Sequence, residues 1–301
     1  MQVILLGTAA GGGFPQWNCW CPVCRVGRSD PAAAHPRSQS SAAISADGSH
    51  WFLLNASPDV RDQLARLPTA TPSDVRQVGF EGVVATDAEL DHTMGLALVR
   101  EARALQLWST AAVRTVLDED SRLLPVTAAF TEVRWHELSP GRSAPLLLRD
   151  GTPSGIEVEP FAVPGDPPRF ARRDLPAHTV GLDLRGPGGA RCLFVPGCGG
   201  ITDGLRRRLA GATLLLFDGT FWAEEELMQL GISDRPAAAM GHLPIGGAAG
   251  SLSGLTPIAP ARRVYTHINN TNPVLIEGSA ERRAVEAAGW VVGDDGMRFD
   301  A

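Results

Sequence analysis

Short apolar runs recur along the whole chain and are separated by glycine and proline. Runs of this kind are typical of buried strands, whereas apolar residues spaced by three and four are typical of helices. The pattern predicts strands at residues 3–6, 51–55, 82–85, 105–108, 156–163, 179–184, 191–195, 213–217, 263–267 and 290–292. It predicts helices at residues 58–67, 96–104, 111–117, 203–209, 224–230, 246–255 and 279–288. Strands dominate the centre and helices flank them, which favours an α/β fold with helices covering sheets.

The overall composition is ordinary for a soluble protein. The chain has 301 residues, of which 44% are hydrophobic and 20% are charged, and its net charge is −6. No apolar run approaches the roughly 20 residues that a membrane span requires. We expect a cytoplasmic protein that binds neither membrane nor nucleic acid, since no basic leader and no broad basic surface are indicated. Without a recognisable linker, residues 1–301 are expected to form one domain.

All 27 basic residues are arginine, because the chain contains no lysine. This excludes an internal Schiff-base lysine, a phosphate-loop lysine and a lysine general base.

Three cysteines stand close together in an insert at about residues 17–26. Cys19, Cys21 and Cys24 form a Cys-x-Cys-x-x-Cys motif. In a reducing compartment such clustering favours structural zinc over a disulfide, and a redox pair is the alternative. A tetrahedral zinc ion needs one more donor, for which His242 and His35 are the candidates.

An acidic turn follows the strand predicted at residues 82–85. It carries Asp87, Glu89, Asp91 and His92 and leads into the helix predicted at residues 96–104. Side chains of a strand-to-helix turn can converge on one point, and this mixture of oxygen and nitrogen donors suits a divalent ion such as iron(II) or manganese. The alternative is an ordinary solvated loop with a helix cap.

Further donors must come from distant segments. His267 ends a predicted strand, and an amide-bearing loop with Asn269, Asn270 and Asn272 follows it. His242 lies on a glycine-flanked loop, where it could act as a ligand, an acid or a zinc donor. The glycines of residues 7–13 lack the spacing of a nucleotide-binding loop and predict a turn that passes close to the metal. Residues 165–176 read as a long surface loop that covers a cleft.

The order of strand, acidic turn and helix resembles the metallo-β-lactamase superfamily, whose turn reads His-x-His-x-Asp-His. Asp87, Glu89, Asp91 and His92 occupy the four ligand positions of that turn, and His267 matches the late histidine of the superfamily. More specific stretches resemble the family of B proteins of pyrroloquinoline quinone (PQQ) biosynthesis. They are residues 9–19, 55–59, 91–95, 218–222, 240–243 and 267–273.

The resemblance implies an αββα sandwich, in which two mixed sheets are flanked by helices. It also implies a role in making PQQ, by iron-dependent hydroxylation of the tyrosine ring of a small Glu–Tyr cross-linked precursor with dioxygen. An older assignment for the family is transport of PQQ or its precursor. Whether the chain forms a homodimer is left open.

Two departures from the superfamily pattern bear on the chemistry. Asp87 and Glu89 replace two imidazoles, and residues 196–199 contain no carboxylate where the superfamily carries its bridging aspartate. A two-metal hydrolytic centre is hard to build without that bridge. Asp91, His92 and His267 remain, which is the ligand set of facial-triad iron(II) oxygenases.

The other polar residues then take supporting roles in this hypothesis. Asp87 and Glu89 orient His92 or move protons, and Asp218 and His242 are candidates for the same work. The three asparagines of the 269–272 loop bind precursor carboxylates, with charge supplied by Arg169, Arg172 or Arg173. A hydrolase that uses Asp87 and Glu89 as ligands to two metals, and a carrier without catalysis, are the alternatives.

Overall fold

The computed structural model describes residues 1–68, 75–76, 78–258, 260 and 262–301. The strands are β1 (Gln2–Gly7), β2 (Ser41–Ser45), β3 (Phe52–Leu54), β4 (Gly82–Val84), β5 (Ala104–Ser109), β6 (Glu132–Glu137), β7 (Ala144–Leu147), β8 (Pro153–Ala162), β9 (Val180–Arg185), β10 (Arg191–Val195), β11 (Leu214–Asp218), β12 (Arg262–Thr266), β13 (Val291–Val292) and β14 (Arg298–Asp300). The α-helices are α1 (Pro22–Ser29), α2 (Val60–Leu64), α3 (Leu90–Thr93), α4 (Gly95–Leu98), α5 (Ala111–Thr115), α6 (Leu123–Ala128), α7 (Asp203–Leu209), α8 (Glu226–Gln229), α9 (Ser251–Leu255) and α10 (Ala280–Ala287). A π-helical turn, η1, spans Val116–Asp120, and 3₁₀ turns span Pro187–Gly189, Ala238–Met240 and Pro273–Leu275.

Within these residues the strands form two mixed sheets of seven strands each. The first sheet has the order β14-β1-β2-β3-β4-β5-β6, and the second has the order β13-β12-β11-β10-β9-β8-β7. In the first sheet β3 to β6 run parallel, and in the second β10 to β13 run parallel. Parallel neighbours align their carboxyl ends at one edge, which is where the polar turns follow.

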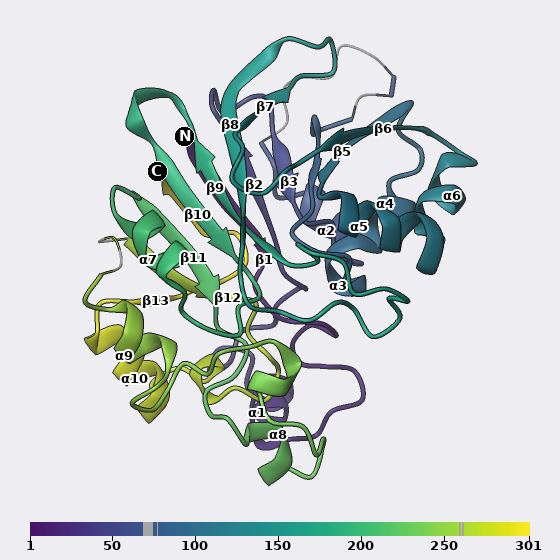
Figure 1. Cartoon of the computed structure of the whole chain (residues 1–301). Coiled ribbons are helices and arrows are strands. Elements are labelled where there is room, and N and C mark those ends of the chain that lie inside the picture. The colour runs from purple at the N-terminus through teal and green to yellow at the C-terminus, as the bar shows by residue number, and fades with distance from the viewer. Residues whose placement is uncertain (69–74, 77, 259, 261) are drawn as a thin grey trace.

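Side-chain alternation along the strands builds the layers. In β1, Val3 and Leu5 face the second sheet and pack with Phe194 and Leu216, whereas Ile4 and Leu6 face the helices. Helices α2, α4, α5 and α6 cover the outer face of the first sheet, and α7, α9 and α10 cover the second (Figure 1). This is the expected αββα sandwich, and burial of apolar side chains in the three clusters between its four layers is what stabilises it.

Several elements differ from the sequence predictions. Strands β2, β6, β7 and β14 and helices α1, α3 and α6 were not predicted, and all are short or rich in small and polar residues. The helix predicted at residues 96–104 is wrong at its end, since it stops at Leu98 and residue 104 already begins β5. The helix predicted at residues 246–255 begins only at Ser251, because glycines occupy its first turn.

The two sheets meet at one end of the sandwich. The segment after β1 and the segment after β12 form backbone hydrogen bonds there, from Ala10 N–H to the Ile268 carbonyl and from Ile268 N–H to the Thr8 carbonyl. The ends of β4, β11 and β12 open beside this junction, so polar residues from distant segments converge on it. No described helix is long and apolar enough to cross a membrane.

Candidate metal centre

Backbone contacts hold the acidic turn after β4 in place. The backbone N–H of Thr86 donates to Asn55 Oδ1 at 2.9 Å, and the N–H of Ala56 donates to the carbonyl of His92 at 2.7 Å. Gly95 allows this close approach, because a Cβ there would lie 2.4 Å from the carbonyl oxygen of Ser57. These contacts therefore fix the turn against the 55–57 loop independently of the candidate ligands.

His92 is oriented by Asp87. Its Nδ1 lies 2.8 Å from both carboxylate oxygens of Asp87, and both side chains are buried. Burial lowers the pKa of His92, but the carboxylates of Asp87 and Asp91 outweigh it and raise the pKa to about 9. An imidazole whose Nδ1–H is held by a carboxylate presents Nε2 as an electron-rich metal ligand. Asp87 therefore lies against the ring of His92, whose orientation the sequence-based hypothesis assigns to it or to Glu89.

The structure brings Asp91, His92 and His267 together. Their ligand atoms all lie within 4.8 Å of one another. His267 Nε2 is 3.3 Å from Asp91 Oδ2, and His92 Nε2 is 3.9 Å from the same oxygen. Burial opposes ionisation of Asp91, yet the neighbouring imidazoles of His92 and His267 hold its pKa well below the usual range. One carboxylate and two imidazoles thus face a common point.

This donor set fits a divalent cation. His92 Nε2 is buried without a hydrogen-bond partner, which is a costly arrangement unless a ligand occupies it. The glycine-rich segment after β1 passes directly by the site, since a Cβ on Gly11 would lie 3.3 Å from Asp91 Oδ2. The close passage that the sequence predicts for this segment is therefore present.

Glu89 lines the cavity beside these ligands. Burial, together with the negative charges of Asp87 and Asp91, raises the pKa of Glu89 to about 7. Its carboxyl group can thus gain or lose a proton near neutral pH, which suits a proton-transfer role.

A second pair, formed by buried Asp218 and partly buried His242, adjoins the first group. Asp218, at the end of β11, accepts a hydrogen bond from His242 Nδ1 at 2.7 Å, and the ring of His242 stacks on that of His267 at 5.3 Å. Burial raises the pKa of Asp218, but the charge of His242 outweighs it and lowers the pKa. The two residues therefore form a paired unit next to His267.

A cavity of about 390 Å³ opens over both groups. Its lining includes Arg169 and Asn269 on the polar side and Phe221, Leu227 and Met240 on the apolar side.

The structure corrects part of the predicted binding loop. Asn269 lines the cavity, but the prediction is wrong for Asn272, whose buried amide donates to the Gly219 carbonyl at 2.9 Å. Asn270 points to the cysteine motif instead. The three candidate arginines also differ in position. Arg169 lines the cavity, whereas Arg172 pairs with Asp120 and Arg173 pairs with Glu119 outside it. These two ion pairs tether the 165–176 loop to η1.

Sequence reasoning missed Thr220, whose hydroxyl contacts Asp218, His242 and His267. No spacing marks this threonine in the sequence, because two of its three partners, His242 and His267, come from distant segments.

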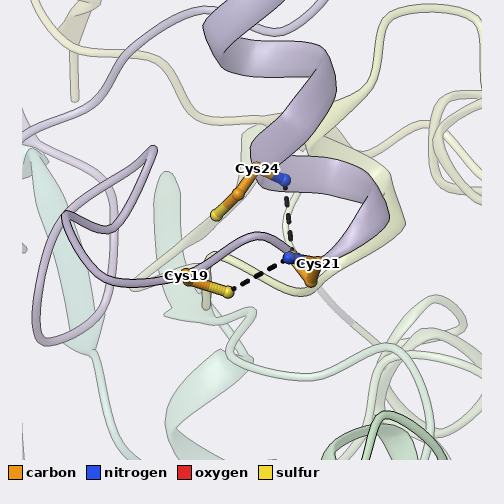
Figure 2. A group of neighbouring side chains, drawn as sticks. All are labelled: Cys19, Cys21 and Cys24. Carbon is orange, nitrogen blue, oxygen red and sulfur yellow. Dashed lines mark hydrogen bonds between the residues drawn. The ribbon is translucent and has the colours of Figure 1, made fainter.

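The three cysteines form a compact group at the start of α1. The Sγ atoms of Cys19, Cys21 and Cys24 lie within 4.8 Å of one another, and Figure 2 shows the three side chains around the turn that opens the helix. The carbonyl oxygen of Asn270 lies 3.6 Å from Sγ of Cys21 and 3.7 Å from Sγ of Cys24. Three soft donors around one point fit zinc.

Neither predicted histidine completes this group. His35 Nδ1 lies 2.7 Å from Asp294, and His242 belongs to the pair with Asp218. Both candidates for the fourth donor are therefore wrong. Instead, Asn270 lies beside the three thiols, and its Nδ2–H donates to Cys24 Sγ at 3.3 Å.

Comparisons with known proteins agree with this architecture. A family model described as "Beta-lactamase superfamily domain" matches residues 50–268. The coenzyme PQQ synthesis protein B of Methylobacterium radiotolerans is 42% identical, and that of Gluconacetobacter diazotrophicus is 40% identical; each match covers 99% of both chains. The crystal structure of Zn²⁺-bound PqqB from Methylobacterium extorquens superposes with a TM-score of 0.91 at 37% identity, over 100% of both chains.

A diphosphatase of the PhnP family shares the fold at 20% identity, with a TM-score of 0.67 over 99% of this chain and 96% of the other. The diphosphatase shows the fold alone, whereas the PQQ synthesis proteins, which match end to end at 40–42% identity, show the family. The chain therefore belongs to the family of coenzyme PQQ synthesis protein B, within the β-lactamase superfamily.

Proposed function

We propose that the chain acts in PQQ biosynthesis and hydroxylates the tyrosine ring of a Glu–Tyr cross-linked precursor. In this proposal ferrous iron is held by Asp91, His92 and His267. The observation that carries it is the group of two buried imidazoles and one partly buried carboxylate, with the unpartnered Nε2 of His92 facing the common point. Such a set leaves positions for substrate and dioxygen on iron(II).

When bound, iron would supply the redox chemistry that dioxygen activation requires. In the overall reaction one oxygen atom enters the ring and the other is reduced to water. The electrons for that reduction must come from an added two-electron reductant such as ascorbate. The ring proton that the new oxygen atom replaces leaves to a base.

The cavity residues provide binding and proton transfer in this proposal. Arg169 pairs with a precursor carboxylate, and the amide of Asn269 donates to another. Phe221 and Leu227 contact the tyrosine ring. Glu89, whose pKa is raised to about 7 by burial and by Asp87 and Asp91, accepts the proton that the ring releases.

A two-metal hydrolase is less well supported by the contacts of Asp218. Its two oxygens already accept from Cys198 N–H at 2.9 Å, His242 Nδ1 at 2.7 Å, Thr220 N–H at 2.9 Å and Thr220 Oγ1 at 2.6 Å. The ligand atoms of Asp218, His242 and His267 also lie within 4.8 Å of one another, but the roughly four acceptor sites of this carboxylate are already used by these donors. The Asp218 and His242 pair therefore acts as support for His267.

Anaerobic titration of Fe(II) tests the ligand set. With the cysteine motif loaded with zinc, the wild-type chain should bind a single further ion tightly, and Asp91→Ala and His267→Ala should each lose that binding. Unchanged affinity in both variants would remove the triad. Binding of two ions in the wild type would favour the hydrolase.

An assay with the cross-linked amino acid, ascorbate and isotopically labelled dioxygen tests the reaction. The product should gain one labelled oxygen atom. Tight binding of the precursor without turnover would favour the carrier.

A further inference from the structure

The hydroxyl of Thr220 lies between Asp218, His242 and His267. Oγ1 is 2.6 Å from Asp218 Oδ1, 2.8 Å from His267 Nδ1 and 3.1 Å from His242 Nδ1. The same atom lies 2.9 Å from the backbone carbonyl of His267. Thr220 is only 3% exposed, so water does not compete for these contacts.

The number of protons decides the direction of these hydrogen bonds. A threonine hydroxyl donates once, whereas an ionised carboxylate and a carbonyl only accept. Asp218 is ionised, because the charge of His242 keeps its pKa low against the effect of burial. At 2.6 Å, two oxygens without a proton between them would repel. The hydroxyl proton is therefore committed to an oxygen, and Oγ1 must accept from the imidazole of His267.

We propose that Thr220 is a positioning residue, which holds His267 in the tautomer with the proton on Nδ1 and leaves Nε2 free to bind the metal. The ring of His267 points the other nitrogen at Asp91, since Nε2 lies 3.3 Å from Oδ2. With the proton on Nδ1, the Nε2 of His267 and the carboxylate of Asp91 are both available to bind one cation. The inference deepens the proposed function and rests on its metal centre.

The backbone of His267 supports the same role. His267 has φ of +55°, a left-handed conformation that is uncommon for a residue other than glycine. Thr220 Oγ1 lies near both the ring and the carbonyl of this residue, and because its single proton goes to Asp218, the hydrogen bond it forms with His267 is the one that it accepts from Nδ1–H. Non-glycine residues in such conformations concentrate at functional sites.

The two imidazole ligands are held by different chemistry. His92 donates to the carboxylate of Asp87, whereas His267 donates to the neutral hydroxyl of Thr220. A charged acceptor raises the basicity of an imidazole more than a neutral one does. Because the two rings have different partners, loss of the Thr220 hydroxyl should change the tautomer of His267 and leave that of His92 unchanged. His92 is therefore an internal control.

The tautomers can be measured by long-range proton–nitrogen NMR on the metal-free full chain, labelled at histidine nitrogens, at mildly alkaline pH. His267 should carry its proton on Nδ1 in the wild type and in Thr220→Ser. In Thr220→Val, which removes the hydroxyl with little change in shape, the preference should be lost, while the His92 signals stay unchanged. A proton on Nε2 of His267 in the wild type would overturn the proposal, even if no variant folds.

Metal affinity provides the second readout. Anaerobic Fe(II) should bind Thr220→Val about 10–100-fold more weakly than the wild type, the usual loss when such a partner is removed, and Thr220→Ser should restore it. An unchanged tautomer together with unchanged affinity in Thr220→Val would contradict the inference. If Asp91→Ala and His267→Ala bind Fe(II) normally, the metal centre itself fails; the wild-type tautomer separates that outcome from failure of the Thr220 role.

Discussion

The Nε2 atom of His267 lies 3.3 Å from Oδ2 of Asp91, although the two residues are 176 positions apart in the chain. Asp91 follows β4 of the first sheet, and His267 follows β12 of the second. The contact exists because both strands end at the junction where the segments after β1 and β12 join. Side chains from two sheets thus complete one group of ligands. Substitutions in the segment that follows either strand should therefore alter metal binding.

The carboxylate of Asp87 should tune metal binding through His92. Asp87→Asn keeps the shape but removes the charge that holds Nδ1–H, so Fe(II) affinity should fall by about 10–100-fold. Anaerobic titration measures this. Asp47→Asn is the matched control, because Asp47 holds His50 Nδ1 at 2.7 Å on the surface. Equal affinity in Asp87→Asn and wild type would show that Asp87 has no such role.

Arg169 should contribute to substrate binding but not to metal binding. Arg169→Ala removes a charged donor from the cavity lining, so KM for the cross-linked precursor should rise about tenfold or more, whereas Fe(II) affinity should stay the same. Arg172→Ala is the control three residues away, since Arg172 pairs with Asp120 outside the cavity. A similar rise in KM for both variants would point to the loop as a whole.

Loss of the zinc expected at the cysteine motif should weaken iron binding. Asn270 contacts Cys24 and stands three residues after His267, so a loosened motif frees the segment that carries the ligand. Cys24→Ser should lose zinc in a metal analysis and bind Fe(II) more weakly. Cys192→Ser, in the buried strand β10, should cost stability but keep its zinc. Normal Fe(II) affinity in zinc-free Cys24→Ser would separate the two sites.

Burial of Glu226 should make stability depend on pH. Burial raises the pKa of Glu226 to about 6, against an ordinary 4.5, so the folded chain binds this proton more tightly than the unfolded chain does. Its contribution is therefore fully present below pH 4.5 and is lost as the pH rises through 6. The loss amounts to about 2 kcal/mol, at about 1.4 kcal/mol per pKa unit.

Denaturant titrations of Glu226→Gln between pH 4 and pH 7 measure this loss against the wild type. The variant should lack that part of the pH dependence. Glu225→Gln removes a charge from the exposed neighbouring position and should keep the wild-type slope. Parallel curves for Glu226→Gln and wild type would mean that Glu226 does not titrate in this range.

The αββα fold and the central ligands could be predicted because their signals are local. Asp91 and His92 stand in a turn between a buried strand and a helix, and His267 ends an apolar strand, so spacing and resemblance suffice to select them. The strand β6 could not be found, because its alternating charged residues at a sheet edge resemble a solvated loop. The helix after the acidic turn was predicted too long, since helix-forming residues continue to the start of β5.

Residues that act through tertiary contacts were harder to identify. Thr220 and Asn270 have no special spacing in the sequence, and their roles depend on what the folded chain places beside them. The same holds for Asn272, whose amide was assigned to the cavity but is used to fix the loop backbone. Sequence patterns select side chains by chemical type, whereas orientation is decided by the packing of both sheets.

The position of the triad across the two sheets has a consequence for the metal-free chain. An ion bound from both sides would join the two layers at this end of the sandwich, and the free energy by which it stabilises the closed arrangement would rise with the logarithm of its concentration above its dissociation constant. Without it, repulsion between acidic side chains and the unmet Nε2 of His92 favour local opening. Amide hydrogen exchange at residues 86–92 and 266–270 should accordingly slow when the ion is added.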